Sequence, residues 1–229
     1  MSRNTYGQTY MSRNKVIGIS GIIGAGKTTL ADCLLERLGK QWMQIKEPVE
    51  TNPYLEKFYA DKEKYGFAMQ VFLLSKRFSL HQSMVWASKS CIVDRTIYED
   101  VIFAKMLHET GNISDLDFNT YRSLFDDMAN FLHRPDLIIY LDVTPETALG
   151  RIKKRGRACE AGMPLEYLQD LEKGYLDWLE TGVAGRIPII RLAWNDNDAL
   201  DDRTGKIKNS VIEGIVDQIR AFERNIIDL

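Results

Sequence analysis

A glycine-rich segment near the N-terminus restricts the possible folds more than any other feature of this sequence. Residues 21–28 read GIIGAGKT and match the pattern GxxxxGK[ST]. The β-branched run Lys15–Ser20 precedes the segment, and Lys27–Leu38 carries leucines at a helical period. A strand, a glycine-rich turn and a helix in this order indicate a phosphate-binding loop, because the turn directs successive backbone N–H groups toward phosphate oxygens. The sequence therefore predicts an α/β fold built around a nucleotide phosphate site.

Two side chains of this loop have an expected role in binding the nucleotide. Lys27 is expected to reach the β- and γ-phosphates of a nucleoside triphosphate, and the Thr28 hydroxyl is expected to bind Mg²⁺. A chance match to the pattern in a chain of this length has odds of roughly one in a hundred. The residues expected to bind the nucleotide are Gly21, Ile22, Ile23, Gly24, Ala25, Gly26, Lys27, Thr28 and Thr29.

The rest of the chain alternates short apolar runs with longer segments of helical period. The predicted strands are Lys15–Ser20, Trp42–Lys46, Ser90–Val93, Asp136–Leu141 and Ile187–Leu192. The predicted helices are Lys27–Leu38, Phe67–Trp86, Thr96–His108, Leu116–Leu132, Pro145–Lys154, Leu165–Leu179 and Ile207–Arg224. This alternation predicts a five-stranded parallel sheet flanked by helices, with ligands at the carboxyl ends of its strands.

Composition narrows the class of protein. A length of 229 residues suits one domain, which we place at residues 15–229, after a disordered tail at 1–14 that has no acidic residue. The net charge of -2 disfavours a dedicated nucleic-acid binder, and no apolar run approaches the ~20 residues of a membrane span. Three dispersed cysteines without a CxxC pair fit a reducing compartment, and we expect a cytoplasmic rather than a mitochondrial protein.

Two classes of phosphate-loop protein remain, a nucleotide-hydrolysing switch and a small-molecule kinase. The third predicted strand ends in Asp94-Arg95, which could supply a metal-side carboxylate and a phosphate-binding arginine. A switch GTPase is expected to carry DxxG at such a place, and this chain does not. Residues 195–198 read NDND, which lacks the lysine of a guanine-reading NKxD. These observations favour a kinase.

Three further segments resemble one kinase family. They read WMQIKEPVETNPY at 42–54, SCIVDRTIYEDVIF at 90–103 and RIKKRGRACEAGMPLEY at 151–167. Together with the phosphate loop they resemble the deoxyribonucleoside kinases, the group that contains deoxyadenosine, deoxyguanosine and deoxycytidine kinases. The resemblance runs from about Lys15 to Arg224. It implies a P-loop kinase fold with a short basic lid at about 151–162, and transfer of the γ-phosphoryl group of ATP, with Mg²⁺, to the 5′-hydroxyl of a deoxynucleoside.

The resemblance also implies roles at the donor side of the site. Glu47 matches the glutamate that takes the proton from the 5′-hydroxyl. Arg95 matches the arginine that holds the transferred phosphate, and Asp94 matches a glutamate or aspartate beside Mg²⁺. The lid arginines that would neutralise phosphate charge are Arg151, Arg155 and Arg157. The loop that would cradle the ATP adenine is Asn195, Asp196, Asn197 and Asp198.

At the acceptor side the resemblance implies a reading of both base and sugar. Gln70 and Arg77 are seven residues apart on one predicted helix and so face the same side. Gln70 matches the residue that pairs with the base edge, and Arg77 with Asp100 matches an arginine–aspartate pair beside the base. Tyr59 and Glu160 match the residues that bind the deoxyribose 3′-hydroxyl.

The resemblance favours deoxyadenosine as the acceptor and a homodimer as the assembly. Deoxyguanosine and deoxycytidine remain alternative acceptors. A nucleoside monophosphate kinase and, from a different class, a nucleotide-hydrolysing switch remain alternative functions.

Overall fold

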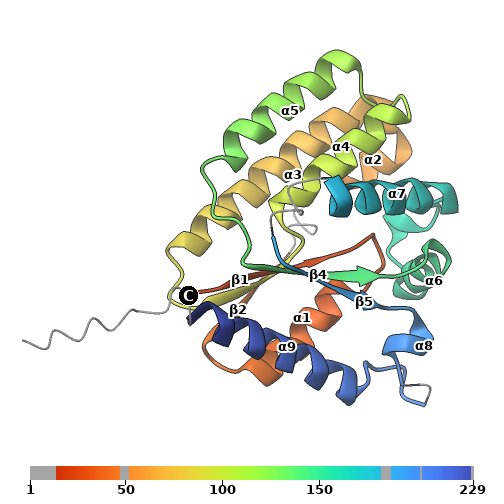
Figure 1. Cartoon of the computed structure of the whole chain (residues 1–229). Helices are drawn as coiled ribbons and strands as arrows, with labels where there is room; N and C mark the ends of the chain where they lie inside the picture. Colours follow the sequence, from red (N-terminus) through yellow and green to blue (C-terminus); the bar gives the residue numbers. More distant parts are fainter. Residues whose placement is uncertain (1–13, 47–51, 182–186, 202, 228–229) are drawn as a thin grey trace, which may run out of the picture.

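The structure is a computed structural model that describes residues 14–46, 52–181, 187–201 and 203–227. Its centre is a five-stranded parallel sheet with the strand order β2-β3-β1-β4-β5, which confirms the predicted fold class (Figure 1). The strands are β1 (Val16–Ser20), β2 (Trp42–Ile45), β3 (Ser90–Asp94), β4 (Leu137–Asp142) and β5 (Ile189–Ala193). Of the predicted tail, only Asn14 lies within the described residues, where its side chain donates to the Ala87 carbonyl.

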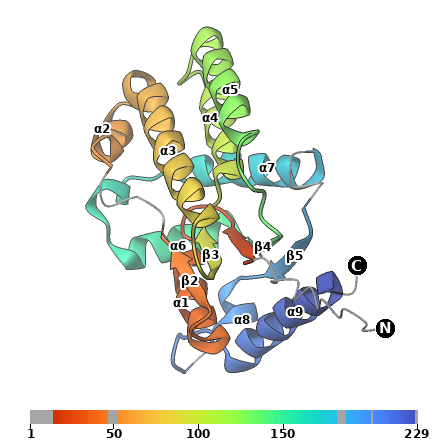
Figure 2. The same ribbon diagram turned by 90° about the vertical axis from the view of Figure 1, so that its left-hand side faces the viewer.

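Helices cover both faces of the sheet (Figures 1 and 2). On one face lie α1 (Lys27–Leu38) and α9 (Asn209–Ile227), which pack against each other. The other face carries α3 (Lys62–Val85), α4 (Asp100–Glu109), α5 (Asp115–Ala129) and α7 (Leu165–Thr181). The remaining helices are α2 (Leu55–Ala60), η1 (Ile97–Glu99), α6 (Pro145–Arg155), η2 (Ala158–Glu160) and α8 (Asp196–Ala199).

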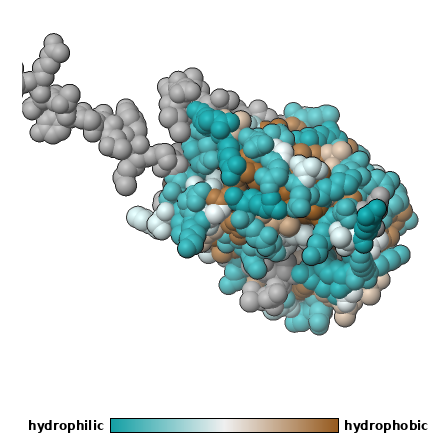
Figure 3. Space-filling model, turned by 90° about the horizontal axis from the view of Figure 1, so that it is seen from below, coloured by the Kyte–Doolittle hydropathy of each residue, from teal (hydrophilic) through white to brown (hydrophobic). Residues whose placement is uncertain are grey.

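The core forms where the apolar strands meet the apolar faces of the helices. All five residues of β1 are buried, because β1 has a neighbouring strand on each side and helices on each face. Leu30 and Leu34 of α1 are fully buried, as their helical spacing predicts. The outer surface below the sheet is mostly hydrophilic, with apolar side chains in small areas (Figure 3).

The structure differs from the predicted elements mainly at helix ends. The long helix α3 begins at Lys62 instead of Phe67, because the Asp61 side chain accepts the Lys64 N–H at 3.0 Å and caps the first turn. The segment predicted as one helix from Thr96 is divided into η1 and α4. Two short helices, α2 and α8, were not predicted, because four to six residues are too few to show a helical period.

The described residues contain neither a membrane-spanning helix nor a disulfide. No helix among the described residues is both long and apolar enough to cross a membrane. The three cysteines, Cys33, Cys91 and Cys159, are not joined by disulfides. Cys91 is buried in β3, where it packs among apolar side chains.

Candidate active site

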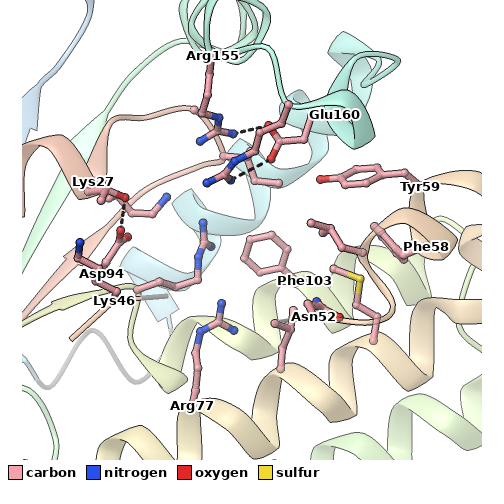
Figure 4. Close-up of a pocket in the computed structure, with 18 of the residues that line it drawn as sticks. Lys27, Lys46, Asn52, Phe58, Tyr59, Arg77, Asp94, Phe103, Arg155 and Glu160 are labelled. Carbon is pink, nitrogen blue, oxygen red and sulfur yellow. Dashed lines mark hydrogen bonds and ion pairs between the residues drawn. The ribbon is translucent and has the colours of Figure 1, made fainter. Parts of the chain in front are cut away.

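A cavity of about 610 Å³ opens at the carboxyl ends of β1, β2 and β3. Its walls come from the phosphate loop, the residues that follow β2 and β3, the helices α2 and α3, and the segment after α6 (Figure 4). It lies where a parallel sheet is expected to bind its ligand. The predicted site residues that line it are Ile23, Gly24, Gly26, Lys27, Thr28, Thr29, Tyr59, Gln70, Arg77, Asp94, Arg95, Arg155, Arg157 and Glu160.

The phosphate loop has the backbone conformation that its glycines permit. Gly24 and Gly26 adopt φ values of 83° and 94°, which side chains strongly disfavour. A Cβ on Gly24 would lie 2.5 Å from the Ala148 carbonyl oxygen. Lys27 is buried, and its ammonium donates to the carbonyls of Gly21 and Ile22, both at 3.0 Å. The loop thus holds its own lysine in place beside the cavity.

Gly21, Ile22 and Ala25 of the same segment do not line the cavity. Ile22 and Ala25 belong to the apolar core instead. In a loop of this kind a residue can contact phosphate through its backbone N–H group alone, so a buried side chain is compatible with the predicted role.

Thr28 and Asp94 meet at the floor of the cavity. The Thr28 hydroxyl donates to Asp94 Oδ2, and Asp94 Oδ1 is buried without a hydrogen-bond partner among the described residues. Mg²⁺ is commonly held in proteins by one or two carboxylates together with substrate phosphates. An aspartate oxygen without a partner beside a threonine hydroxyl fits such an ion, so the donor set agrees with the predicted metal residues.

Arg95 occupies an unusual position between the sheet and the cavity. Its backbone φ is 66°, the left-handed region that a residue other than glycine rarely adopts. Its guanidinium donates to the Tyr175 hydroxyl at 2.5 Å and to the Gly21 carbonyl at 3.3 Å, and it stacks 4.5 Å from the centre of the Phe103 ring. Arg95 is almost fully buried yet lines the cavity, so its charge is directed at whatever the cavity binds.

The far end of the cavity contains the predicted base-reading residues. Gln70 and Arg77 project from α3 into the cavity and are both buried. Arg77 forms an ion pair with Asp100, which lies behind it on α4 and does not line the cavity. The structure therefore brings the predicted pair together, with the arginine on the cavity side.

A buried histidine supports the turn after β3. His81 of α3 accepts the Ile97 N–H at Nε2 over 3.2 Å. Burial, with smaller contributions from Arg77 and His133, lowers the pKa of His81 to about 4. His81 is therefore neutral at pH 7. The sequence does not identify it, because its partner lies sixteen residues away in another element.

Two arginines of the predicted lid, Arg155 and Arg157, form a cluster of ion pairs with Glu160. Glu160, buried at the end of η2, accepts Arg155 Nη2 at 2.5 Å and Arg157 Nη1 at 3.4 Å (Figure 4). Tyr59 directs its hydroxyl toward this cluster. Burial raises the pKa of Tyr59 well above its usual range, so its phenol stays protonated. Both predicted sugar-binding residues thus lie at one edge of the cavity.

Arg151 lies apart from the other lid arginines and does not line the cavity. Its Nη1 donates to the Ala25 carbonyl at 2.9 Å, and its Nη2 donates to the Trp194 carbonyl and to Asp196, both at 2.7 Å. Arg151 therefore ties the phosphate loop to the segment after β5.

The segment Asn195–Asp198, expected as a loop, instead begins the short helix α8. Asn195 and Asp198 form a capping box, in which each side chain accepts the backbone N–H of the other residue. Asn195 also accepts the Thr144 N–H at 3.0 Å. None of the four residues lines the cavity.

Glu47, the predicted base, lies outside the described residues, directly after the cavity-lining Lys46. Sequence reasoning missed most of the apolar lining, since nothing distinguishes these side chains from core residues before the fold is known. The lining residues that were not predicted are Lys46, Asn52, Leu55, Phe58, Met69, Leu73, Phe103 and Tyr167.

Comparison with known proteins gives consistent matches. A deoxyadenosine kinase of Dictyostelium discoideum is 49% identical over 180 residues, which cover 79% of this chain and 72% of that protein. A deoxyadenosine/deoxycytidine kinase of Bacillus subtilis is 38% identical over 213 residues, which cover 92% of this chain and 94% of that protein. The solved structure of deoxyadenosine kinase from M. mycoides with bound dATP has a TM-score of 0.76 and 33% identity, and covers 90% of this chain and 100% of that one.

The family assignment follows from the extent of these matches. The sequence profile of the deoxynucleoside kinase family matches residues 17–220, nearly the whole chain. The four segments that suggested the resemblance all lie within or overlap this range. The chain therefore belongs to the deoxynucleoside kinase family, whose members are phosphotransferases that use a nucleoside triphosphate donor.

Proposed function

We propose that this kinase transfers the γ-phosphoryl group of ATP to the 5′-hydroxyl of deoxyadenosine. The observation that carries the choice of acceptor is the buried Gln70 at the base end of the cavity, beside the Arg77–Asp100 pair. A glutamine amide both donates and accepts, so it can pair with the N–H and the ring nitrogen of one adenine edge. The identities agree with this choice, because the D. discoideum deoxyadenosine kinase is 49% identical and the deoxyguanosine kinase of the same organism is 35% identical.

In the proposed reaction the chain acts by positioning and by charge. Lys27 and the backbone of the phosphate loop hold the donor phosphates, and Arg95 binds the oxygens of the transferred group. Glu47 accepts the proton of the 5′-hydroxyl as that oxygen attacks phosphorus. Tyr59 and Glu160 bind the 3′-hydroxyl and so orient the sugar. General base action is typically worth 10²–10⁴-fold in rate, and orientation supplies much of the remainder.

Thr28 and Asp94 are the residues that would hold Mg²⁺, which supplies charge neutralisation on the phosphate oxygens when it is bound. In the same proposal Arg155 and Arg157 exchange part of their pairing with Glu160 for donor phosphate. Arg151 and residues 195–198 would form the outer wall of the donor site, which the contacts between Arg151, Asp196 and the Ala25 carbonyl support.

Deoxycytidine is the second candidate acceptor. The B. subtilis relative is named a deoxyadenosine/deoxycytidine kinase, and deoxyadenosine kinase from M. mycoides also has a solved structure with bound dCTP. A glutamine amide can also pair with the amino group and ring nitrogen of cytosine. We therefore expect turnover of deoxycytidine at a lower kcat/KM than that of deoxyadenosine.

We also propose a homodimer formed through α3 and α5. The large exposed apolar side chains among the described residues lie on or directly after these helices, at Trp86, Leu116, Leu124 and Phe131. Such side chains in neighbouring helices favour a protein interface. Light scattering during size-exclusion chromatography should give about twice the chain mass of 26.3 kDa, and Phe131→Glu should shift it toward the monomer. A monomeric wild-type protein would contradict this assembly.

The test of the reaction is a phosphoryl-transfer assay with ATP and Mg²⁺ against each deoxynucleoside and each monophosphate, with a no-acceptor control. We expect the highest kcat/KM with deoxyadenosine. A higher value with deoxyguanosine or deoxycytidine would refute the assignment of the base but leave the reaction in place. Glu47→Gln should lower kcat by about 10²–10⁴-fold. Its matched control is Glu50→Gln in the same segment, which should keep the wild-type rate.

A further inference from the structure

A chain of buried polar groups connects the cavity to the interior of the protein. Arg95 Nη1 donates to the Tyr175 hydroxyl at 2.5 Å, and this hydroxyl donates to Glu99 Oε2 at 2.7 Å. Tyr175 comes from α7 and Glu99 from η1, and both are fully buried. Arg95 lines the cavity, whereas Tyr175 and Glu99 do not. Tyr175 therefore contacts the arginine from behind, Glu99 contacts Tyr175, and neither residue lines the cavity.

The second oxygen of Glu99 holds the backbone next to Arg95. Glu99 Oε1 accepts the Thr96 N–H at 2.8 Å and the Thr96 hydroxyl at 3.2 Å, which closes the capping box of η1. Thr96 follows Arg95, whose φ of 66° is costly for a residue with a side chain. One carboxylate thus constrains Arg95 at both ends, through the adjacent peptide and through the Tyr175 hydroxyl.

The hydrogen-bond chain has only one possible direction. A guanidinium has donors and no acceptor, so the Tyr175 hydroxyl must accept from Arg95 and turn its own proton toward Glu99. Burial raises the pKa of Tyr175 well above its usual range, which keeps that proton on the phenol. Glu99 in turn needs both oxygens as acceptors, one for Tyr175 and one for Thr96.

We propose that Glu99 and Tyr175 are positioning residues that fix the guanidinium of Arg95 for phosphoryl transfer. The inference rests on the proposed function, in which Arg95 binds the transferred phosphoryl group. A fixed guanidinium meets the charge that develops on the phosphoryl oxygens without first having to reorganise. Without the hydroxyl, Arg95 keeps its stacking on Phe103 but loses a hydrogen bond that fixes its plane.

Two substitutions remove this support while preserving volume. Tyr175→Phe deletes the hydroxyl and leaves the ring, which packs against Tyr140 and Trp178. Glu99→Gln replaces one acceptor oxygen by a donor. If the NH₂ group faces Thr96, it opposes the Thr96 N–H, which is also a donor. If it faces Tyr175 instead, it opposes the Tyr175 hydroxyl proton, which must then turn away toward Arg95.

The matched control is Tyr98→Phe. Tyr98 is also buried, and its hydroxyl donates to the Leu132 carbonyl at 3.4 Å, so the control removes a buried phenol hydroxyl of the same kind. We expect Tyr175→Phe and Glu99→Gln to lower kcat by about 10- to 100-fold, a range typical of a misplaced catalytic group. The KM for deoxynucleoside should change by less than about threefold, because neither residue reaches the acceptor. Tyr98→Phe should stay within about twofold of wild type in both constants.

Arg95→Ala separates this inference from the proposed function. If Arg95 acts as proposed, Arg95→Ala lowers kcat at least as far as Tyr175→Phe, and the double variant Arg95→Ala/Tyr175→Phe is no slower than Arg95→Ala alone. Wild-type kcat in Arg95→Ala would refute the role of Arg95 itself. A slow Arg95→Ala together with Tyr175→Phe and Glu99→Gln that match Tyr98→Phe would refute only the positioning role. Should Tyr175→Phe fail to fold, the same comparison of kcat is made with Glu99→Gln and with the double variant Arg95→Ala/Glu99→Gln. A double variant that is no slower than Arg95→Ala alone would support the positioning role, and Glu99→Gln with the kcat of Tyr98→Phe would refute it.

Discussion

The neutral state of His81 has a measurable effect on stability. The imidazole is buried, and its Nε2 accepts the Ile97 N–H, a role that a protonated ring cannot perform. Burial opposes protonation of this ring most strongly, and Arg77 and His133 oppose it to a smaller extent. Burial and these neighbours lower its folded-state pKa from 6.5 to about 4.

The sign and size of the effect follow from this shift in pKa. Between pH 6.5 and about 4 the unfolded histidine binds a proton that the folded one does not. The free energy of unfolding therefore falls as the pH is lowered through this window, by about 1.4 kcal/mol for each pH unit. The full loss attributable to His81 is about 3 kcal/mol at pH 4.

The perturbation is His81→Gln, whose amide oxygen can still accept the Ile97 N–H. Urea unfolding of both proteins at half-unit steps from pH 7 to pH 4.5 gives two curves of unfolding free energy. We expect the wild-type curve to fall more steeply than the variant curve below pH 6.5, by about 2–3 kcal/mol in total. Partly buried acids such as Glu172, whose pKa is raised by desolvation, act in the opposite direction, but they are present in both proteins and cancel in the difference.

His108→Gln removes a partly exposed imidazole that pairs with Asp115, and the steep fall should persist in that variant. The chain has three histidines, so proton NMR can also follow the titration of the His81 ring directly. Parallel stability curves for wild type and His81→Gln, or a His81 ring that titrates near 6.5, would refute the reasoning.

Three further outcomes are expected at the site. Gly24→Ala places a Cβ 2.5 Å from the Ala148 carbonyl oxygen, at a backbone φ of 83°. The affinity for ATP, measured by calorimetry, should therefore fall at least about tenfold. An unchanged affinity would contradict the loop geometry. Asp100→Ala leaves the buried charge of Arg77 without this partner, so the free energy of unfolding measured in urea should fall by about 3–5 kcal/mol. A fall of less than about 1 kcal/mol would mean that the ion pair contributes little to stability. Asp94→Asn should raise the Mg²⁺ concentration for half-maximal rate by about tenfold or more, and an unchanged Mg²⁺ dependence would exclude Asp94 from the metal site.

The sequence predicts those parts of the structure that depend on local patterns. The phosphate loop is a contiguous motif, and α1 begins and ends where its lysine and leucine spacing predicts. The five strands are short apolar runs between helical segments, so their number and parallel arrangement could be inferred. Asp94 and Arg95 were found because each follows the end of a predicted strand.

Contacts between distant segments could not be predicted in this way. Tyr175 is eighty residues from Arg95 along the chain, and in the sequence it is an apolar position of an amphipathic helix. Glu99 stands beside Asp100 in the sequence, and the burial of both depends on how η1 and α4 pack against each other and against α3. The pairing of Glu160 with two arginines likewise depends on the turn at Gly156, which directs the chain back from α6 toward the cavity.

The strand order has a consequence for how the molecule opens. β1 lies in the middle of the sheet, paired with β3 and β4, and every one of its residues is buried. Its amide protons should therefore exchange with solvent only when the whole domain unfolds, whereas those of the short elements α2 and η2 at the cavity rim should exchange through local opening. On this expectation the strand that leads into the phosphate loop belongs to the most protected unit of the protein, and the edge that carries Tyr59 and Glu160 belongs to a labile one. Substitutions in α2 and η2 can accordingly alter the edge that carries Tyr59 and Glu160 without weakening the cooperative unit that contains β1.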